Sequence, residues 1–541
     1  MKFSKVLALF MALAVSLTAC GNPRKDPSPS ASPSGDSIVA SEGVEIKLSD
    51  DVVQVDGTRA GTDPASAVYI ANDIVYYESG KDFTYGEGTK EDAHDAAEAA
   101  AHTVIHITKP GTYSISGTLS RGQIAVDLGE GAEEDPQAVV TLILNGVDIT
   151  CEVAPAVIFY RVYECGNTDA DHATKDVDTS AAGANVVIAD GTTNTVNGSY
   201  VARIYKPGSV VLNEAGTEVE DAKKLHKYDG AFYSKMSINV NDGEEGTGVL
   251  NINAVNEGLD SELHLTINGG NINIKSGNDG INTNEDGISV TTVNGGALTI
   301  QVTGETGEGD GIDSNGWLVI NGGTVIAAAC STSGDAGIDS DMGIHVNGGT
   351  VMATGHMLDR IEDGGQTYAV FTFAQKQNGS QTVNLKNEDG RTLMDLKPLN
   401  GYSILVYSSP ELKAGTYTLW SDDTQLVGQS GGGMAGGHGL PGMRPDGMTL
   451  PGGMENMAPP NGNPQFDGMQ PPDGQFPPDG YQRPDGGERP EKPGGQTGGW
   501  NPGNGFTPGG NWQQGELTAE FKIVAGANMF NGISIMIEAK K

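Results

Sequence analysis

The sequence is poor in cysteine and in positive charge, and each shortage excludes a class of protein. Four cysteines in 541 residues exclude a scaffold held by disulfides. Beyond the first 20 residues, Cys151 and Cys165 are one possible pair and Cys330 is left over. Lysine and arginine number 32 against 70 aspartates and glutamates, which gives a formal charge of −38. A surface of that sign repels nucleic acid and anionic lipid, so we expect neither as a partner.

Long apolar segments are also scarce, and after the first 20 residues none is long enough to span a bilayer. At the N-terminus, Lys2 and Lys5 precede an apolar run from Val6 to Leu17, and small residues then lead to Cys20. This order is typical of a bacterial lipoprotein signal peptide. We therefore expect residues 1–20 to be the signal, Cys20 to be acylated, and the membrane to be contacted through this anchor only.

Two segments have a composition that cannot pack a core. Residues 21–43 are rich in proline and serine and are expected to form a flexible tether. Residues 428–515 are dense in glycine, proline and methionine, with recurrent Pro-Asp-Gly, and are expected to be a disordered insertion. The alternative is a loop that contacts wall polymer or another surface protein. The anchor and tether together predict a location on the extracellular face of the bacterial cell membrane.

What the chain has in abundance is a repeat, which runs from Glu257 to Gly355. Its Asn-Gly-Gly turns, which suit corners that need positive φ, begin at residues spaced 26, 27 and 26 apart. These residues are Asn268, Asn294, Asn321 and Asn347. Between the turns apolar and polar residues alternate, which indicates short β-strands. Self-similarity at a fixed period favours a solenoid over a sandwich. The sequence therefore predicts an all-β protein with a right-handed parallel β-helix over residues 44–360.

A second motif alternates with the first and consists of an acidic residue, a glycine, an apolar residue and an aspartate or asparagine. Coils stacked about 4.8 Å apart place these side chains in columns, where carboxylates repel unless they are protonated or bind a cation. One such motif is equally consistent with a solvated turn, but four repeats favour an ion, and oxygen donors favour Ca²⁺. The predicted calcium ligands are Glu257, Asp260, Asp279, Asn282, Asp310, Asp313, Asp335, Asp339 and Asp341.

Strand patterns continue on both sides of the repeat. Residues 44–82 contain candidate strands, and the alanine-rich segment 92–101 is expected to form a short helix or a cap over the open end of the solenoid. Residues 361–427 have the pattern of antiparallel strands. Residues 516–541 return to strand alternation, so we expect them to complete a C-terminal β module.

The ordered motifs resemble those of a known family. They run from Gly111–Leu119 and Leu142–Ile149 through Asp190–Thr195 and Asp229–Lys235 into the acidic and Asn-Gly-Gly coils. This succession, over residues 44–422, is similar to the cell-surface carbohydrate-binding β-helix family of anaerobic bacteria. The resemblance implies a fold like that of pectate-lyase-type polysaccharide lyases, calcium within the helix, and binding of cellulose-like or acidic, pectin-like polysaccharide without an established catalytic activity. One departure is Ala336, which stands where the other coils have an acid.

Three functions are compatible with these patterns. The first is a non-catalytic, polysaccharide-binding surface lipoprotein, which we expect to be a monomer and which binds sugar through calcium or aromatic faces. The candidate aromatics are Tyr160, Tyr163, Tyr205, Tyr228, Phe232, Tyr233 and Trp317. The second is a calcium-dependent polysaccharide lyase, which needs a base. The basic side chains near the coils are Arg121, Arg203, Lys235 and Lys275. The third is an adhesin or structural protein that calcium only stiffens.

Overall fold

The structure, a computed structural model of the chain, describes residues 43–166, 168–430 and 517–535. The expected signal peptide with Cys20, the tether up to residue 42 and nearly all of the Gly/Pro/Met-rich segment lie outside the described residues. Within them, no helix is both long enough and apolar enough to cross a membrane.

The described residues are nearly all β, and their one α-helix is short. Helix α1 spans Ala96–Ala100, within the alanine-rich segment, so the prediction of a helix there is confirmed. Asp95 caps its N-terminus by accepting hydrogen bonds from the N–H groups of Ala97 and Glu98 at 2.9 and 2.8 Å. The helix lies between the antiparallel pair β4 (Val68–Ala71) and β5 (Thr103–Ile107) in the chain.

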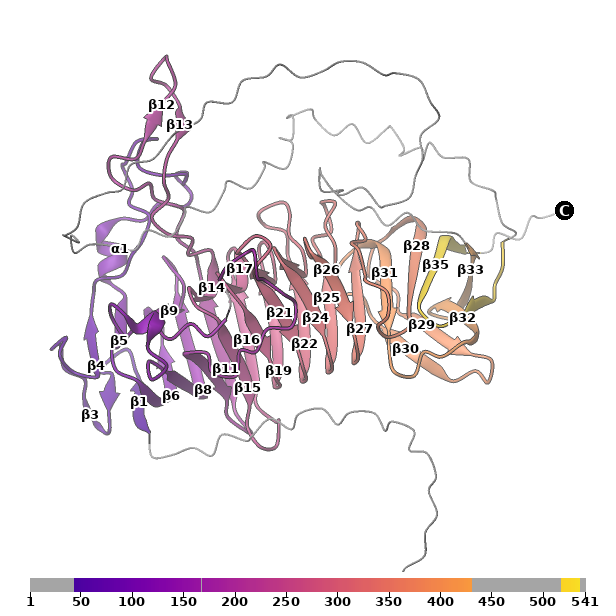
Figure 1. Cartoon of the computed structure of the whole chain (residues 1–541), viewed down its shortest axis with the longest axis horizontal. Helices are drawn as coiled ribbons and strands as arrows, with labels where there is room; N and C mark the ends of the chain where they lie inside the picture. The colour runs from indigo at the N-terminus through magenta and orange to yellow at the C-terminus, as the bar shows by residue number, and fades with distance from the viewer. Residues whose placement is uncertain (1–42, 167, 431–516, 536–541) are drawn as a thin grey trace, which may run out of the picture. The chain divides into compact units, whose positions relative to one another are not determined.

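Three ladders of parallel strands make up most of the structure (Figure 1). The first continues from β5 through β7 (Gly122–Asp127), β9 (Val157–Arg161), β14 (Gly230–Ser234), β17 (Glu257–Ser261), β20 (Ile281–Thr283) and β23 (Ile312–Ser314). The second contains β10 (Ala184–Ile188), β15 (Ile238–Asp242), β18 (Leu265–Ile267), β21 (Val290–Val293), β24 (Trp317–Ile320) and β26 (Gly343–Val346). The third contains β11 (Thr193–Gly198), β16 (Val249–Ala254), β19 (Asn271–Ser276), β22 (Ala297–Val302), β25 (Thr324–Ala328) and β27 (Thr350–Gly355).

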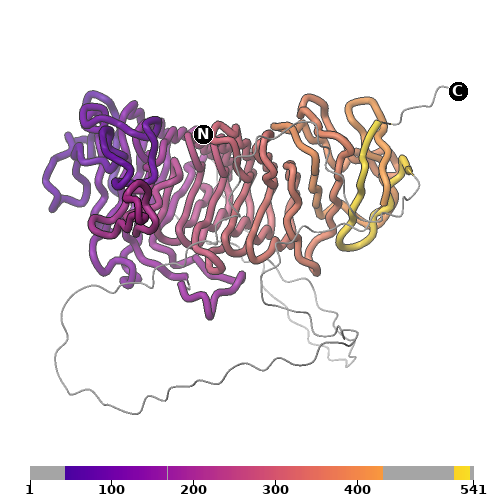
Figure 2. The backbone as a smooth tube through the Cα atoms, turned by 90° about the horizontal axis from the view of Figure 1, so that it is seen from above, coloured from indigo at the N-terminus to yellow at the C-terminus, as the bar shows by residue number. Residues whose placement is uncertain are grey.

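Each complete repeat contributes one strand to each ladder, in the order first, second, third. The last repeat contributes only β26 and β27, to the second and third ladders. Figure 2 shows the successive turns of the backbone lying side by side. The long strand β8 (Val140–Cys151) pairs with β10 through its first half and with β11 through its second half. On its other side lies β6 (Gly111–Leu119), which in turn pairs with β1 (Val44–Leu48). A hairpin of β2 (Gln54–Val55) and β3 (Thr58–Arg59) flanks β1.

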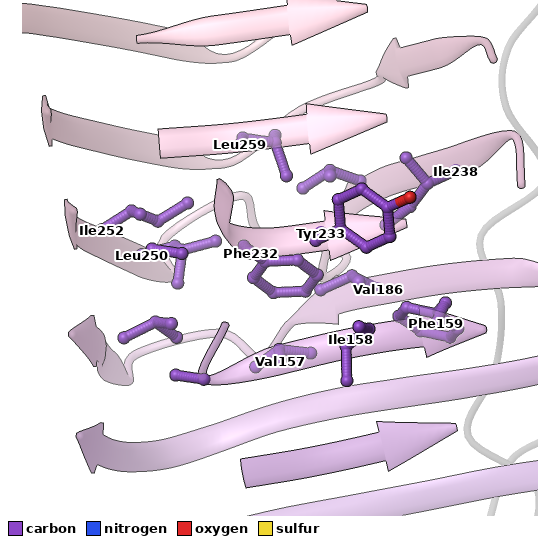
Figure 3. Packing of buried hydrophobic residues seen from close by; sticks show 14 of the residues in the cluster. Val157, Ile158, Phe159, Val186, Phe232, Tyr233, Ile238, Leu250, Ile252 and Leu259 are labelled. Atoms are coloured by element: carbon purple, nitrogen blue, oxygen red, sulfur yellow. The ribbon is translucent and has the colours of Figure 1, made fainter. Parts of the chain in front are cut away.

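The core is a set of apolar columns that follow the register of the ladders. In the first ladder, Val157 lies opposite Phe232, Phe232 opposite Leu259, and Leu259 opposite Ile281 (Figure 3). All four side chains are fully buried. Burial of each such side chain stabilises the fold by about 1.5–3 kcal/mol. Because neighbouring residues of a strand point to opposite faces, the residue after each core residue points away from this core.

Glycine is needed in the two repeated motifs for different structural reasons. In the Asn-Gly-Gly turns the second glycine has positive φ, for example +80° at Gly296 and +77° at Gly323, as the sequence predicts. In the acidic motif the reason is close approach, since a Cβ on Gly311 would lie 2.3 Å from the carbonyl oxygen of Gly337. The same holds for Gly280, where a Cβ would lie 2.1 Å from Ile300 Cγ2.

The C-terminal strands are mostly antiparallel and form a second apolar cluster. The predicted strands are β28 (Tyr368–Gln377), β29 (Val383–Asn387), β31 (Tyr402–Ser408) and β32 (Gly415–Ser421). The structure adds β30 (Thr392–Leu396) and β33 (Thr424–Ser430), the second of which extends three residues into the predicted insertion. The returning strands are β34 (Phe521–Ile523) and β35 (Ala527–Ile535).

The two returning strands follow the segment that the structure does not describe, and they pair with strands that precede it. Strand β34 pairs with β32, and β35 lies between β28 and β33 (Figure 1). The pairing of β35 with β28 is parallel, unlike the antiparallel pattern expected for this region. The three cysteines of the described residues, Cys151, Cys165 and Cys330, are free.

Candidate functional site

The predicted acidic columns form on the first ladder. Asp260 of β17 lies opposite Asn282 of β20, which lies opposite Asp313 of β23. Each follows a core residue and therefore points away from the core. These three side chains are nevertheless at most 8% exposed. The ladder thus holds a column of oxygen-bearing side chains that is shielded from water.

A second column lies beside the first and is held by backbone hydrogen bonds. The N–H of Gly258 donates to the carbonyl oxygen of Asp279, and that of Gly280 donates to the carbonyl oxygen of Asp310, both at 3.0 Å. Glu257, Asp279 and Asp310 are all buried. The N–H of Asp310 also donates to Oδ1 of Asp279 at 2.7 Å. The backbone of each coil therefore fixes the position of the acid in the neighbouring coil.

Three carboxylates from the two columns meet in one group. Oxygens of Asp310, Asp313 and Asp339 all lie within 4.8 Å of one another. Asp310 and Asp313 are buried and Asp339 is half-buried. Burial first, and then the charges of Asp279 and Asp313, raise the pKa of Asp310 well above its usual range. Burial, followed by the charges of Asp313 and Asp359, raises the pKa of Asp339 to about 8.

A second group lies two coils earlier and contains buried oxygens without a hydrogen-bond donor. These atoms are Oε2 of Glu257, Oδ2 of Asp260 and Oδ1 of Asn282. Asn282 Nδ2 donates to Oε1 of Glu257 at 3.2 Å, and Asn284 Nδ2 donates to Oδ1 of Asp260 at 2.5 Å. Burial, with a smaller contribution from neighbouring carboxylates, raises the pKa of both Glu257 and Asp260 well above their usual ranges. Buried oxygens that lack donors need a proton or a cation.

Asp335 and Asp341, the remaining predicted ligands, differ in their roles. The carboxylate of Asp335 accepts hydrogen bonds from the N–H of Gly309, at 2.7 Å, and from the hydroxyl of Ser333. It is therefore used in a turn and is not part of the group of three carboxylates. Asp341 lies near that group, because its charge contributes to the raised pKa of Asp339. Its N–H donates to the carbonyl oxygen of Ser314 at 3.0 Å.

Sequence reasoning missed two acids that belong to this neighbourhood. Asp359 accepts a hydrogen bond from the N–H of Ser340 at 3.0 Å and raises the pKa of Asp339, although it comes after the last repeat. Asp229 lies beside Glu257, whose N–H donates to its carbonyl oxygen at 3.2 Å. Asp229 precedes a glycine, as the repeated acids do, and this signal could have identified it.

Asp229 is also the partner of Arg203, one of the basic side chains near the coils. Arg203 Nη2 lies 3.0 Å from Oδ2 of Asp229. Burial favours the neutral form of Arg203, but the charge and hydrogen bond of Asp229 outweigh it and raise the pKa of the guanidinium above its usual range. Arg203 thus carries a fixed positive charge at the N-terminal end of the acidic columns.

The candidate aromatics separate into buried and partly exposed residues. Phe232 and Tyr233 are at most 1% exposed, so their faces cannot bind a sugar. Tyr160, Tyr163, Tyr205, Tyr228 and Trp317 are half-buried. Tyr228 packs edge-on against Tyr160, with ring centroids 5.6 Å apart, and stacks on His226 at 4.4 Å.

Comparison with known proteins identifies the family to which the chain belongs. A family model described as "carbohydrate-binding domain-containing protein" matches residues 101–382, more than half of the chain. The chain belongs to this carbohydrate-binding domain family. All nine predicted calcium ligands lie within the matched residues. So do the seven half-buried or buried aromatics.

One curated relative and one solved structure are also similar to the chain. A carbohydrate-binding domain-containing protein of Acetivibrio thermocellus is 31% identical over 173 residues, which are 32% of this chain and 45% of the relative. The chain thus spans slightly under half of that relative. The structure of a polysaccharide lyase-like protein from C. thermocellum, a gadolinium derivative, matches with 20% identity and a TM-score of 0.31. That match covers 57% of this chain and 93% of the other.

Proposed function

We propose that this carbohydrate-binding domain protein is a non-catalytic, lipid-anchored surface protein that binds plant cell-wall polysaccharide through a calcium-loaded, right-handed parallel β-helix. The family match supports carbohydrate as the ligand. The parallel pairing of strands from successive repeats in each of three ladders supports the β-helix. The basic, apolar and small-residue order that ends at Cys20 supports the anchor.

The observation that carries the calcium proposal is the group formed by Asp310, Asp313 and Asp339. Three carboxylates with oxygens within 4.8 Å are unfavourable unless protons or a cation neutralise them. Protonation would require carboxyl groups to stay neutral at pH 7, which is costly for three neighbours that all ionise in the unfolded chain. A divalent cation neutralises them together, and an all-oxygen set suits Ca²⁺.

The group around Glu257 fits a cation for a second reason. Oε2 of Glu257, Oδ2 of Asp260 and Oδ1 of Asn282 are buried acceptors that no protein donor satisfies. All three are the hard oxygen ligands that calcium prefers. We propose that Glu257, Asp260 and Asn282 hold one ion and Asp310, Asp313 and Asp339 hold another. Bound calcium would offset the repulsion within the columns and offer a ligand position to the carboxylate of an acidic sugar.

We propose that the protein is not a lyase because most of its candidate bases are held in ion pairs. Lyase chemistry needs a base that gives up its proton before it attacks. Arg203, the basic residue placed at the columns, is instead held protonated by Asp229. Lys235 pairs with Glu133 at 3.4 Å and Arg121 pairs with Glu152 at 3.6 Å. Three of the four candidate bases are thus in ion pairs, which favours a binding role over the lyase alternative.

The test is binding of the soluble protein without its leader to immobilised polygalacturonate and cellulose, in calcium and in EDTA. Binding to polygalacturonate that is stronger in calcium than in EDTA would support the proposal. Release of unsaturated uronides, followed by ultraviolet absorbance, would replace it with the lyase. Calcium-dependent folding without binding to either polymer would replace it with the structural alternative.

A further inference from the structure

A cleft separate from the acidic columns lies between two segments distant in sequence. It has a volume of about 840 Å³ and is lined by residues from 74–85 and from 204–225. The second segment contains the two-stranded sheet of β12 (Val211–Leu212) and β13 (Val219–Asp221), and both segments lie near the N-terminal end of the ladders (Figure 1). The volume is typical of a small-molecule site.

The two walls of the cleft are joined by main-chain hydrogen bonds. The N–H of Tyr205 donates to the carbonyl oxygen of Tyr85, and that of Glu87 donates to the carbonyl oxygen of Arg203, both at 2.9 Å. Within the second segment, the N–H of Leu225 donates to the carbonyl oxygen of Ile204 at 2.7 Å. A Cβ on Gly86 would lie 2.3 Å from the oxygen of Arg203, so this glycine permits the contact. Main-chain hydrogen bonds between the two segments therefore hold the walls of the cleft together.

Its lining combines aromatic rings with charged groups. Tyr76, Tyr85 and Tyr205 are half-buried and line the cleft. Lys81 Nζ lies 5.0 Å from the centre of the Tyr85 ring and pairs with Glu78 at 2.7 Å. The rings of Tyr85 and Tyr77 pack edge to face, with their centres 5.0 Å apart. This contact supports the orientation of the Tyr85 ring.

This combination matches the surface of a pyranose ring. One face of such a ring carries C–H groups, which pack on aromatic rings, and its edge carries hydroxyls, which pair with charged and polar side chains. Lys81 and Lys206 place positive charge in the cleft, and Glu78 and Asp82 place an equal negative charge there. Since the family match begins at residue 101, the wall from residues 74–85 lies outside it.

We infer that this cleft is a second saccharide-binding site, in which Tyr85 and Tyr205 stack on the pyranose rings of a polysaccharide chain without calcium. The inference takes its ligand class from the proposed function but uses none of the calcium ligands. Both cellulose-like and uronate polymers offer pyranose rings.

The experiment is calorimetric titration of the soluble protein in EDTA with cellohexaose and, separately, with hexagalacturonate. We expect at least one to bind, and Tyr85→Ala or Tyr205→Ala to weaken it by about tenfold. Tyr85→Phe, which keeps the ring, should stay within about twofold of the wild type. Trp420→Ala, which removes a half-buried aromatic from β32, should have no effect.

Hydrogen exchange of the wild type keeps the test independent of whether the alanine variants fold. Bound hexasaccharide should slow exchange in the peptides that cover residues 74–87 and 203–225. Absence of binding in EDTA, or binding that both alanine variants retain, would overturn the inference. Neither result concerns calcium-dependent binding at the acidic columns, which Asp310→Asn tests separately.

Discussion

The N–H of Ala336 donates a hydrogen bond of 2.6 Å to Oδ1 of Asp310. The N–H of Asp310 makes the same contact with Oδ1 of Asp279 in the preceding coil. Each acid is thus anchored by the backbone of the next coil, whatever side chain that coil carries. Ala336 therefore supplies the donor although it lacks a carboxylate. The departure of the last coil from the acidic motif leaves the orientation of Asp310 intact.

Replacement of Asp310 by asparagine separates charge from geometry. The amide side chain keeps an oxygen that can accept from the N–H of Ala336, but the substitution removes one of the three close carboxylates. In EDTA we expect Asp310→Asn to be more stable than the wild type by about 1 kcal/mol, because repulsion is relieved. In calcium we expect it to be less stable, since the wild type gains about 2.7 kcal/mol at 100 times Kd. Denaturant unfolding in both buffers measures the two effects.

Asp389→Asn is the matched control, because it removes the same charge from an exposed turn. It should leave stability within about 0.5 kcal/mol of the wild type in both buffers. If Asp310→Asn lowered stability equally in EDTA and in calcium, the carboxylate would have a purely structural role.

The calcium-free protein should lose stability as the pH rises. The pKa of Asp339 is about 8 in the folded protein and near the ordinary value of 3.8 when unfolded. Between these values the folded state binds more protons, so the stability that Asp339 contributes is fully present below about pH 4 and is lost as the pH rises through about 8. Asp310, Glu257 and Asp260 act in the same direction. Calcium competes with these protons, so its stabilisation should grow over the same range.

Thermal melts at pH 5, 6, 7 and 8 in EDTA and in calcium check this dependence. A melting temperature in EDTA that rose across this range would mean that the buried acids are ionised without a cation.

The glycine of the acidic motif should be required for stacking. In Gly311→Ala, the new Cβ would lie 2.3 Å from the oxygen of Gly337 and 3.0 Å from Ala327 Cβ. Ala327 is in β25, and the oxygen of Gly337 accepts a hydrogen bond from the N–H of Ile312 at 3.2 Å. Neither can move freely, so we expect a loss of about 1–3 kcal/mol in unfolding free energy. Gly61→Ala is the control, because its Cβ would meet no atom within 4 Å. Equal stability of the two variants would show that the coils can separate at no cost.

The asparagines of the Asn-Gly-Gly turns form a ladder of side-chain hydrogen bonds, which should stabilise the fold cooperatively. Asn294 Nδ2 donates to Oδ1 of Asn268, and Asn321 Nδ2 donates to Oδ1 of Asn294, both at 2.9 Å. We expect Asn294→Ala to cost about 0.5–1.5 kcal/mol. A double-mutant cycle of Asn268 with Asn294 should be non-additive by at least about 0.5 kcal/mol. The cycle of Asn268 with Asn347, which are not bonded to each other, should be additive.

Much of this arrangement could be predicted because the repeat encodes it locally. The spacing from Asn268 to Asn347 fixes the length of each coil, and the order of acid, glycine and apolar residue fixes which side chains face the core. The register of Asp260, Asn282 and Asp313 follows directly from these two features. Helix α1 was equally visible, as an alanine-rich run after an aspartate cap.

Features that depend on contacts between distant segments could not be predicted. Arg203 and Asp229 are brought together by an irregular segment that has no repeat to align it. The cleft depends on the pairing of Gly86 with Ile204, across more than 100 residues. Asp335, which was predicted as a ligand from its place in the sequence, lies outside the group of three carboxylates, and its Oδ2 accepts a hydrogen bond from the N–H of Gly309. Strand β30 was missed because its pattern is short and follows a charged turn.

Calcium binding tests the central claim most directly. Chelator-treated protein, titrated with calcium in a calorimeter near pH 7, should bind saturably and release protons, because the ion replaces those held by the buried acids. Asp310→Asn and Asp313→Asn should each weaken binding by at least about tenfold, whereas Asp389→Asn should bind as the wild type does. Absence of saturable binding, or equal binding by all three variants, would contradict a calcium ion held by the acidic columns.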